Sequence, residues 1–297
     1  MAKYGLPYMG SKSAIADKII AVLPAGERFI DLFGGGGAMT HAAALSGKYS
    51  EVIYSDADPL ACEYVARAMR GDYSPERFTP RWVTREEFFA KKDVDPYIRY
   101  CWSFGNRGGG YLYGRHVEGL KRRLFEWVVY GQDPDFAVGL GIPVADAPDG
   151  IAERLAFIKR HTRVRLKTLG TIENLERLAE MESLERLARM RMQNLQSFSG
   201  LALVHRGYEA YQYHAGDVVY CDPPYASRRK YVIGDFDFAA FLDWAARIPC
   251  YVSSYELDDP RFRIYHEFEK QQLIAVKKNC AVIERLYASR YASKERI

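Results

Sequence analysis

Residues 29–45 read FIDLFGGGGAMTHAAAL. The apolar run Phe29–Phe33 is typical of a short buried strand, the four glycines that follow predict a tight turn, and the alanine-rich stretch Ala38–Leu45 predicts a helix. A strand, a glycine turn and a helix in this order open the doubly wound α/β folds. A second apolar run, Val52–Ser55, follows the helix and predicts a neighbouring strand. The sequence therefore predicts an α/β protein that binds a ligand beyond the carboxyl ends of its strands.

The glycine turn also indicates which kind of ligand fits. Glycines let a ligand approach the backbone where a Cβ atom would collide. A phosphate site of the Gly-x-Gly-x-x-Gly type would need a third glycine where this chain has Met39, so a nucleoside-like ligand without phosphates fits better. Asp56 follows the second strand, where its carboxylate can accept hydrogen bonds from both ribose hydroxyls. A flexible turn for the glycines and a helix cap for Asp56 stay open as alternatives.

A second informative stretch lies in the last third of the chain. The apolar run Asp217–Cys221 predicts a buried strand, and Asp222-Pro223-Pro224-Tyr225 follows it directly. Proline lacks an amide donor, so carbonyl oxygens near the two prolines are left to accept hydrogen bonds. Together with a carboxylate and an aromatic face, these acceptors suit a planar group that carries an NH2. The alternative is an ordinary corner between a strand and a turn.

This tetrapeptide is the motif of amino-directed methyltransferases, and Phe33-x-Gly35-x-Gly37 is similar to their motif for S-adenosylmethionine (AdoMet). The chain thus resembles the Dam-type (D12 class) DNA N6-adenine methyltransferases, well over about residues 5–58 and 201–290 and loosely between them. The resemblance implies a Rossmann-like class I AdoMet-dependent methyltransferase sheet, and methyl transfer to N6 of a flipped-out adenine in double-stranded DNA. It assigns catalysis to Asp222, Pro223, Pro224 and Tyr225.

The resemblance extends to the start of the chain. In the family, a segment of the kind found at residues 7–13 covers the methionine end of the cofactor. The alternative is that Ser11 or Ser13 caps a helix and that Lys12 is merely solvated. The cofactor-binding residues implied by the resemblance are Tyr8, Gly10, Lys12, Asp31, Phe33, Gly35, Gly37, Asp56 and Asp222.

Aromatic, arginine and glycine residues are interleaved over residues 97–115. Basic side chains can neutralise phosphates while rings stack on bases or wedge between them. The family places its DNA-recognition insertion in this stretch, and a basic loop after the tetrapeptide suits phosphates near the flipped base. A glycine-bent hairpin that packs its own aromatic rings would have the same pattern. The DNA-binding residues that we expect are Asn106, Arg107, Tyr111, Tyr113, Arg115, Arg228, Arg229 and Lys230.

The strand–helix alternation is interrupted in the middle of the chain. We expect an AdoMet-binding catalytic domain of residues 1–58 and 201–297, and a target-recognition insertion, largely helical, at residues 59–200. Within the insertion, Leu175–Ala179 recurs as Leu184–Ala188, and the charge pattern favours a helix. A packing helix, a dimer arm and a basic DNA-facing surface are all compatible with this repeat.

The composition limits the kinds of partner and cellular compartment that we expect for the protein. A net charge of +4 and a pI near 8.6 permit nucleic-acid binding without demanding it. The 5 cysteines are widely spaced and form no Cys-x-x-Cys pair, so we expect neither disulfides nor a metal site. The first residues lack the apolar core of a signal peptide and no stretch is long enough to span a membrane, so a soluble cytoplasmic protein is expected. Monomer and homodimer are both compatible with the sequence.

Other functions stay open at this stage. An RNA N6-adenine methyltransferase would carry the same tetrapeptide, because the substrate is chosen elsewhere in the chain. A non-catalytic DNA-binding relative is the second alternative, although both motifs are intact and in order. A cytosine N4 enzyme usually has serine in place of Asp222, and a nicotinamide dehydrogenase would need the third glycine.

Overall fold

The computed structural model describes residues 4–74, 76–139, 144–151, 153–154, 156–157, 200–224, 236–272 and 280–292. The chain forms two compact units, the sheet unit of residues 1–70 and 192–297 and the helical unit of residues 71–191. Helix α3 (Pro59–Met69) packs against two strands of the sheet, so the sheet unit extends beyond residue 58, where the sequence predicted a boundary.

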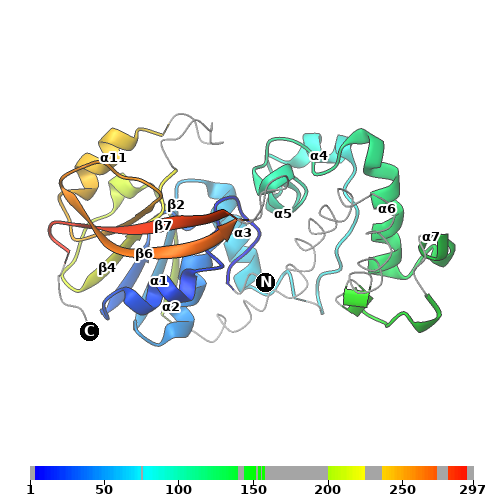
Figure 1. Ribbon diagram of the computed structural model, residues 1–297, viewed down its shortest axis with the longest axis horizontal. Helices are drawn as coiled ribbons and strands as arrows, with labels where there is room; N and C mark the ends of the chain where they lie inside the picture. Colours follow the sequence, from blue (N-terminus) through cyan, green and yellow to red (C-terminus); the bar gives the residue numbers. More distant parts are fainter. Residues whose placement is uncertain are drawn as a thin grey trace. The chain divides into compact units, whose positions relative to one another are not determined.

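The sheet unit is built on seven strands in the order β3-β2-β1-β4-β5-β7-β6. The first five run parallel to one another, whereas β7 is antiparallel to β5 and to β6. The predicted α/β class with a Rossmann-like methyltransferase sheet is confirmed by this arrangement (Figure 1). The strands are β1 (Arg28–Asp31), β2 (Glu51–Asp56), β3 (Leu201–His205), β4 (Asp217–Cys221), β5 (Tyr251–Ser254), β6 (Phe262–Gln272) and β7 (Cys280–Ser289).

Helices cover both faces of this sheet. In Figure 1, α1 (Ala16–Val22) and α2 (Ala38–Ser46) lie on one face and α11 (Phe238–Ala245) lies on the other. A strand covered on both sides reads as a nearly continuous apolar run, which explains why every residue of β4 and of β5 is buried. On the α11 side, Phe241 packs into a core cluster with apolar side chains of β1, β4 and β5.

The described part of the helical unit consists of short helices joined by turns. Thr84 caps α4 (Arg85–Lys91), and Asp95 caps α5 (Pro96–Cys101), whose first residue is a proline as N-terminal helix positions favour. The longest helix, α6 (Arg115–Tyr130), ends at a glycine in the left-handed conformation. The remaining elements are the 3-10 turns η1 (Phe104–Asn106) and η2 (Val144–Asp146), and α7 (Pro134–Gly139).

Two small cores hold these helices. One is aromatic and centres on Trp102, whose ring lies against Trp82, Tyr113 and Phe125. The other joins α6 and α7 through Leu124, Trp127, Val128, Ala137 and Phe157. The predicted repeat at residues 175–188 lies outside the described residues. Within the described ranges, we find no helix with the length and apolar character that crossing a membrane requires.

Candidate active site

Three aspartates meet at one edge of the sheet. Asp31 is the last residue of β1, Asp56 is the last residue of β2, and Asp222 follows the last residue of β4. Because β1 lies between β2 and β4 and all three run parallel, these carboxyl ends share one edge. The chain leaves β1 toward β2 on one side, and later enters β4 on the other side. Ligands of open α/β sheets bind at such a reversal of strand order.

The glycine turn between β1 and α2 fits closely against the residues around it. A Cβ atom on Gly34 would lie 2.1 Å from the Tyr54 ring, and one on Gly35 would lie 2.8 Å from the Tyr8 ring. Gly35 also has a φ of +48°, which side-chain-bearing residues rarely adopt. The four glycines thus allow a backbone path that other residues would block.

Asp56 fastens this turn to the next helix. One carboxylate oxygen accepts from the amide of Gly35 at 2.8 Å, and the other accepts from the amide of Asp58 at 2.8 Å. The N-cap of α3 is Asp58, so the helix-cap role considered for Asp56 belongs to its neighbour. Burial raises the pKa of the Asp56 carboxyl to about 6, although both hydrogen bonds oppose the shift. Each oxygen has a second lone pair, so further hydrogen bonds can be accepted.

Asp31 lies deeper and is almost wholly buried. One of its oxygens accepts from both the amide and the hydroxyl of Thr40 on α2, at 3.0 and 2.7 Å. Burial raises the pKa of the Asp31 carboxyl to about 7; the hydrogen bonds from Thr40 oppose the shift and the negative charge of Asp222 adds to it. A positively charged ligand at this edge would reverse that shift.

The segment at the start of the chain lies against the glycine turn. The amide of Leu6 donates to the carbonyl of Gly36 at 2.7 Å, and the Tyr8 ring lies over Gly35. Gly10 has a φ of +77°, and open space surrounds the position of a Cβ there. The first segment therefore meets the glycine turn at Gly35 and Gly36.

Lys12 joins this segment to the tetrapeptide corner. Its ammonium donates to both carboxylate oxygens of Asp222, each at 2.6 Å. The lysine is 3% exposed, whereas the aspartate side chain is 19% exposed and can be reached from solvent. Burial alone would lower the pKa of Lys12, but the charges of Asp222 and Glu284 together outweigh burial and raise it. A solvated Lys12, the alternative kept open above, does not agree with this burial.

A second carboxylate near Lys12 was not among the predicted site residues. Glu284 on β7 lies 3.8 Å from the lysine nitrogen and accepts a hydrogen bond from the Ser253 hydroxyl at 3.0 Å. The sequence does contain a signal for it. Strand side chains alternate between faces, and Glu284 takes an inward position in line with the buried Leu286 and Ala288. A charged residue at such a position indicates a buried partner.

The other predicted residues of the sheet unit differ in their surroundings. Pro223 is buried and Pro224 is partly exposed. The Phe33 ring packs on Tyr208 and Phe241 in the core cluster, so much of it is engaged in packing. Four predicted residues lie outside the described residues: Tyr225, Arg228, Arg229 and Lys230.

The helical unit holds the remaining predicted residues. Arg107 and Arg115 are exposed, whereas the Asn106 side chain donates to the carbonyl of Tyr100 at 2.6 Å. Tyr111 and Tyr113 are 6% and 3% exposed. The pattern of a hairpin that packs its own aromatic rings, considered above, describes these two tyrosines.

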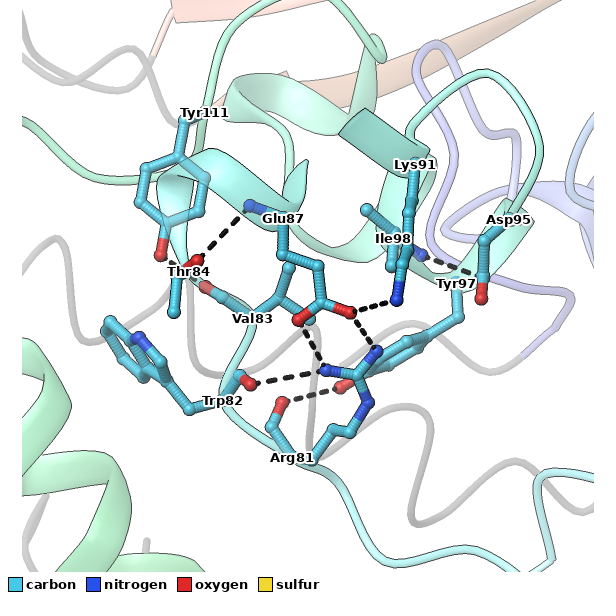
Figure 2. A network of polar contacts seen from close by, with 10 residues as sticks. All are labelled: Arg81, Trp82, Val83, Thr84, Glu87, Lys91, Asp95, Tyr97, Ile98 and Tyr111. Carbon is cyan, nitrogen blue, oxygen red and sulfur yellow. Dashed lines mark hydrogen bonds and ion pairs between the residues drawn. The ribbon is translucent and has the colours of Figure 1, made fainter. Parts of the chain in front are cut away.

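Figure 2 shows how Tyr111 is held. Its hydroxyl donates to the carbonyl of Val83 at 2.6 Å, beside the cap that Thr84 provides for α4. In the same network, Arg81 donates two hydrogen bonds to Glu87, each at 2.8 Å, and Tyr97 donates to the carbonyl of Arg81. These contacts fasten the segment before α4 to both α4 and α5, so Tyr111 contributes to the packing of the unit.

Comparison with known proteins shows a similarity in the first part of the chain. Residues 8–72, which include β1, the glycine turn, β2 and α3, match the family of D12 class N6 adenine-specific DNA methyltransferases. No curated protein matches the chain. Among solved structures, an rRNA methyltransferase (aviRa) from Streptomyces viridochromogenes is similar at 14% identity, with a TM-score of 0.36 over 93% of this chain and 82% of that one. The structural likeness is too low to bear on substrate or mechanism. The predicted resemblance is thus supported by a family match: over residues 8–72 the chain is similar to D12 class N6 adenine-specific DNA methyltransferases, and this similarity indicates an enzyme.

Proposed function

We propose that this enzyme transfers the methyl group of AdoMet to N6 of an adenine that is flipped out of double-stranded DNA. The observation that carries the proposal is the shared edge of the sheet. The glycine turn, Asp31, Asp56 and Asp222 all lie at the carboxyl ends of β1, β2 and β4, and Lys12 joins the turn side of the edge to Asp222. A cofactor and an acceptor base bound at this edge would be neighbours.

The residues at the edge fit AdoMet. Methyltransferases of this family and fold generally use it. AdoMet carries a ribose and two positively charged groups but no phosphate. Asp56 would accept from the ribose hydroxyls with its remaining lone pairs, and the buried carboxyl of Asp31 would stabilise positive charge. Tyr8 and Gly10 would cover the ligand from the first segment of the chain.

The chemistry at Asp222 follows from the electronic structure of adenine. The N6 amino group is a poor nucleophile because its lone pair is delocalised into the ring. Asp222 and the carbonyl of Pro223 would each accept a hydrogen bond from one N–H of this group. These hydrogen bonds localise the lone pair on nitrogen and stabilise the positive charge that develops there. When bound, AdoMet supplies a methyl group on a sulfonium, a strong electrophile. The protein holds the two reactants in line, which contributes up to about 7–11 kcal/mol in favourable cases.

Lys12 prepares Asp222 for this role. Two donated hydrogen bonds fix the plane of the carboxylate, so the remaining lone pairs point in defined directions. A carboxylate oriented before the substrate arrives needs no reorganisation during the reaction.

Double-stranded DNA as the substrate requires base flipping, because N6 inside a duplex cannot reach a carboxylate at a sheet edge. Tyr225 would stack on the flipped base, a contact worth about 1–3 kcal/mol in single-stranded recognition. Exposed Arg107 and Arg115 of the helical unit would contact phosphates, as would Arg228, Arg229 and Lys230 after the tetrapeptide.

Methyl transfer from labelled AdoMet tests the proposal directly. The purified protein is given duplex DNA, the single strands of that duplex, and RNA of the same sequence, and the products are digested to nucleosides. We expect N6-methyladenine from the duplex. Transfer to RNA alone would replace the DNA substrate by RNA, and AdoMet binding without transfer to any nucleic acid would favour a non-catalytic relative.

Asp222→Ala tests the catalytic role of the corner. We expect transfer to fall by at least about a hundredfold, as when an oriented catalytic hydrogen-bonding group is removed, while AdoMet binding by calorimetry is retained. Asp258→Ala, at an exposed aspartate of the same unit, is the matched control and should be as active as the parent. Near-normal turnover of Asp222→Ala would remove this residue from the mechanism.

A further inference from the structure

Glu284 is a buried carboxylate that the proposed mechanism leaves without a role. It lies on β7, next to β5 in the sheet, and its exposed fraction is 0%. Its neighbours along the inward face of β7 are apolar. A charge at such a position is unfavourable unless other groups compensate it, so the groups that meet Glu284 show what it does.

Two groups from other elements meet one oxygen of this carboxylate. The Ser253 hydroxyl on β5 donates to Oε1 at 3.0 Å, and the ammonium of Lys12 lies 3.8 Å from the same oxygen. Lys12 is held more closely by Asp222, at 2.6 Å from each oxygen. One buried lysine therefore stands between two carboxylates, and the three formal charges sum to one negative charge.

Glu284 thus acts on the lysine from a second side. Coulomb attraction falls only as the inverse of distance, so Glu284 at 3.8 Å still attracts the charge that Asp222 holds at 2.6 Å. Without the second carboxylate, the buried ammonium would lose part of the negative charge that stabilises it. Lys12 would then orient the Asp222 carboxylate less firmly for the amino hydrogens of a substrate.

We propose that Glu284, held by Ser253, is a positioning residue that keeps the Lys12 ammonium charged and in place beside Asp222, and so keeps the Asp222 carboxylate oriented as an acceptor. This inference rests on the proposed function of Asp222. It concerns the chemical step and not the affinity for nucleic acid, because Glu284 is buried and reaches the reacting groups only through Lys12.

Glu284→Gln keeps the shape of the side chain and the acceptor for Ser253 but removes the charge. We expect kcat for methyl transfer to fall about tenfold, as for residues that orient a reacting group from behind, with KM for DNA unchanged. Ser289→Ala is the matched control, because Ser289 is a buried hydrogen-bonded serine on the same strand and contacts the backbone of residues 248 and 250. Its kcat should equal that of the parent.

Two further variants distinguish the loss of the Glu284 charge from a general folding defect. Ser253→Ala frees the Glu284 carboxylate to turn, and should lower kcat in the same direction by a smaller factor. Glu284→Asp restores the charge at a shorter reach, and should recover part of the lost kcat. An unchanged kcat in Glu284→Gln, or equal losses in Glu284→Gln and Glu284→Asp, would overturn the inference.

The pH profile supplies a readout that a purely structural role would not move. The titratable groups that face Lys12 are Asp222, Glu284 and Tyr255, and the charge of Glu284 raises the pKa of Lys12. Removing that charge lowers this pKa, so the alkaline loss of kcat should begin at a lower pH in Glu284→Gln than in the parent. Identical alkaline limbs would contradict an action through Lys12.

A double-mutant cycle with Lys12→Met separates this inference from the proposed function. Glu284→Gln should destabilise the parent, whereas in the Lys12→Met background it removes a buried charge that has lost its lysine and should destabilise less, or even stabilise, the protein against urea. The unfolding cycle needs no methyl transfer, so additive effects there refute the Lys12–Glu284 interaction even in an inactive protein. The other outcome is coupling in the cycle together with a parent protein that transfers no methyl group. It would confirm the Lys12–Glu284 interaction but refute the proposed function, and with it the role of Glu284 in catalysis.

Discussion

Lys12 and Asp222 are separated by 210 residues in the chain, yet the lysine ammonium lies 2.6 Å from both oxygens of the aspartate. The contact brings the first segment of the chain to the tetrapeptide corner after β4. It makes the geometry of the candidate active site depend on a segment that belongs to no strand of the sheet.

Lys12→Met should therefore reduce both stability and activity. The substitution removes the lysine charge that lies beside Asp222 and Glu284, and breaking a buried ion pair typically destabilises by about 3–5 kcal/mol. Urea unfolding measures the change, and labelled methyl transfer measures the accompanying loss of activity. Lys18→Met, at an exposed lysine of α1, is the control and should match the parent. Equal stability of the two variants would show that Lys12 is not a structural counter-charge.

Asp31 should make the protein without cofactor less stable as the pH rises. Its pKa is about 7 in the folded protein against 3.8 for an ordinary aspartate, so between these values the folded state holds a proton that the unfolded chain has released. Its stabilising contribution is complete below about pH 4 and is lost as the pH rises through 7. The measurement is the urea midpoint at pH 5 and pH 8 for the parent and for Asp31→Asn.

The comparison with Asp31→Asn is needed because His41 acts in the opposite direction. Burial lowers the pKa of His41 to about 4 from 6.5, so its contribution to stability grows with pH across that range. Asp31→Asn keeps His41 and removes only the carboxyl. We expect the parent to lose stability relative to the variant between pH 5 and pH 8, and parallel curves would contradict the raised pKa.

Gly35→Ala should destabilise the glycine turn more than Gly10→Ala does. Both positions have positive φ, which disfavours alanine by about 1–2 kcal/mol. Only at Gly35 would the new Cβ atom collide, at 2.8 Å from the Tyr8 ring, whereas Gly10 faces open space. Thermal unfolding of the two variants gives the difference. Adding Tyr8→Ala to both variants should reduce the difference in their thermal stability. A difference that persists without the Tyr8 ring would assign the effect to another contact.

Arg107→Ala and Arg115→Ala should weaken binding to duplex DNA and make it less dependent on salt. Each lost phosphate contact lowers the slope of log affinity against log salt by about one. Fluorescence anisotropy at several salt concentrations measures the slope. Tyr111→Phe is the informative partner: it should lose about 1 kcal/mol of stability with the hydrogen bond to Val83 and leave DNA affinity unchanged. An affinity loss in Tyr111→Phe would return this tyrosine to the DNA-binding set.

The edge of the sheet could be predicted from the sequence because its signals are local. The glycine turn and the corner at Asp222 come directly after predicted strands, and Asp56 ends another strand. Parallel strands bring these ends together. Nothing local could predict that Asp56 would hold the amide of Gly35 while Asp58 caps α3, since both aspartates suit either role.

The contacts of Lys12 and Glu284 could not be predicted in the same way. They depend on the order of strands in the sheet, which places β7 beside β5 and the first segment over the end of β4. For Tyr111 and Tyr113, a local pattern exists but does not predict whether the ring is buried. An aromatic residue beside arginines and glycines has the same pattern whether its ring is exposed or packed on tryptophans, and only the fold decides between them.

The pairing of β1 with β4 has a consequence for protein synthesis. The first two strands leave the ribosome early, but the strand that completes the centre of the sheet is translated only after the whole helical unit. Nascent chains that stop before residue 217 lack both the partner of β1 and the corner at Asp222. Prematurely terminated products should therefore be inactive in methyl transfer, and their incomplete sheet should make them prone to aggregation.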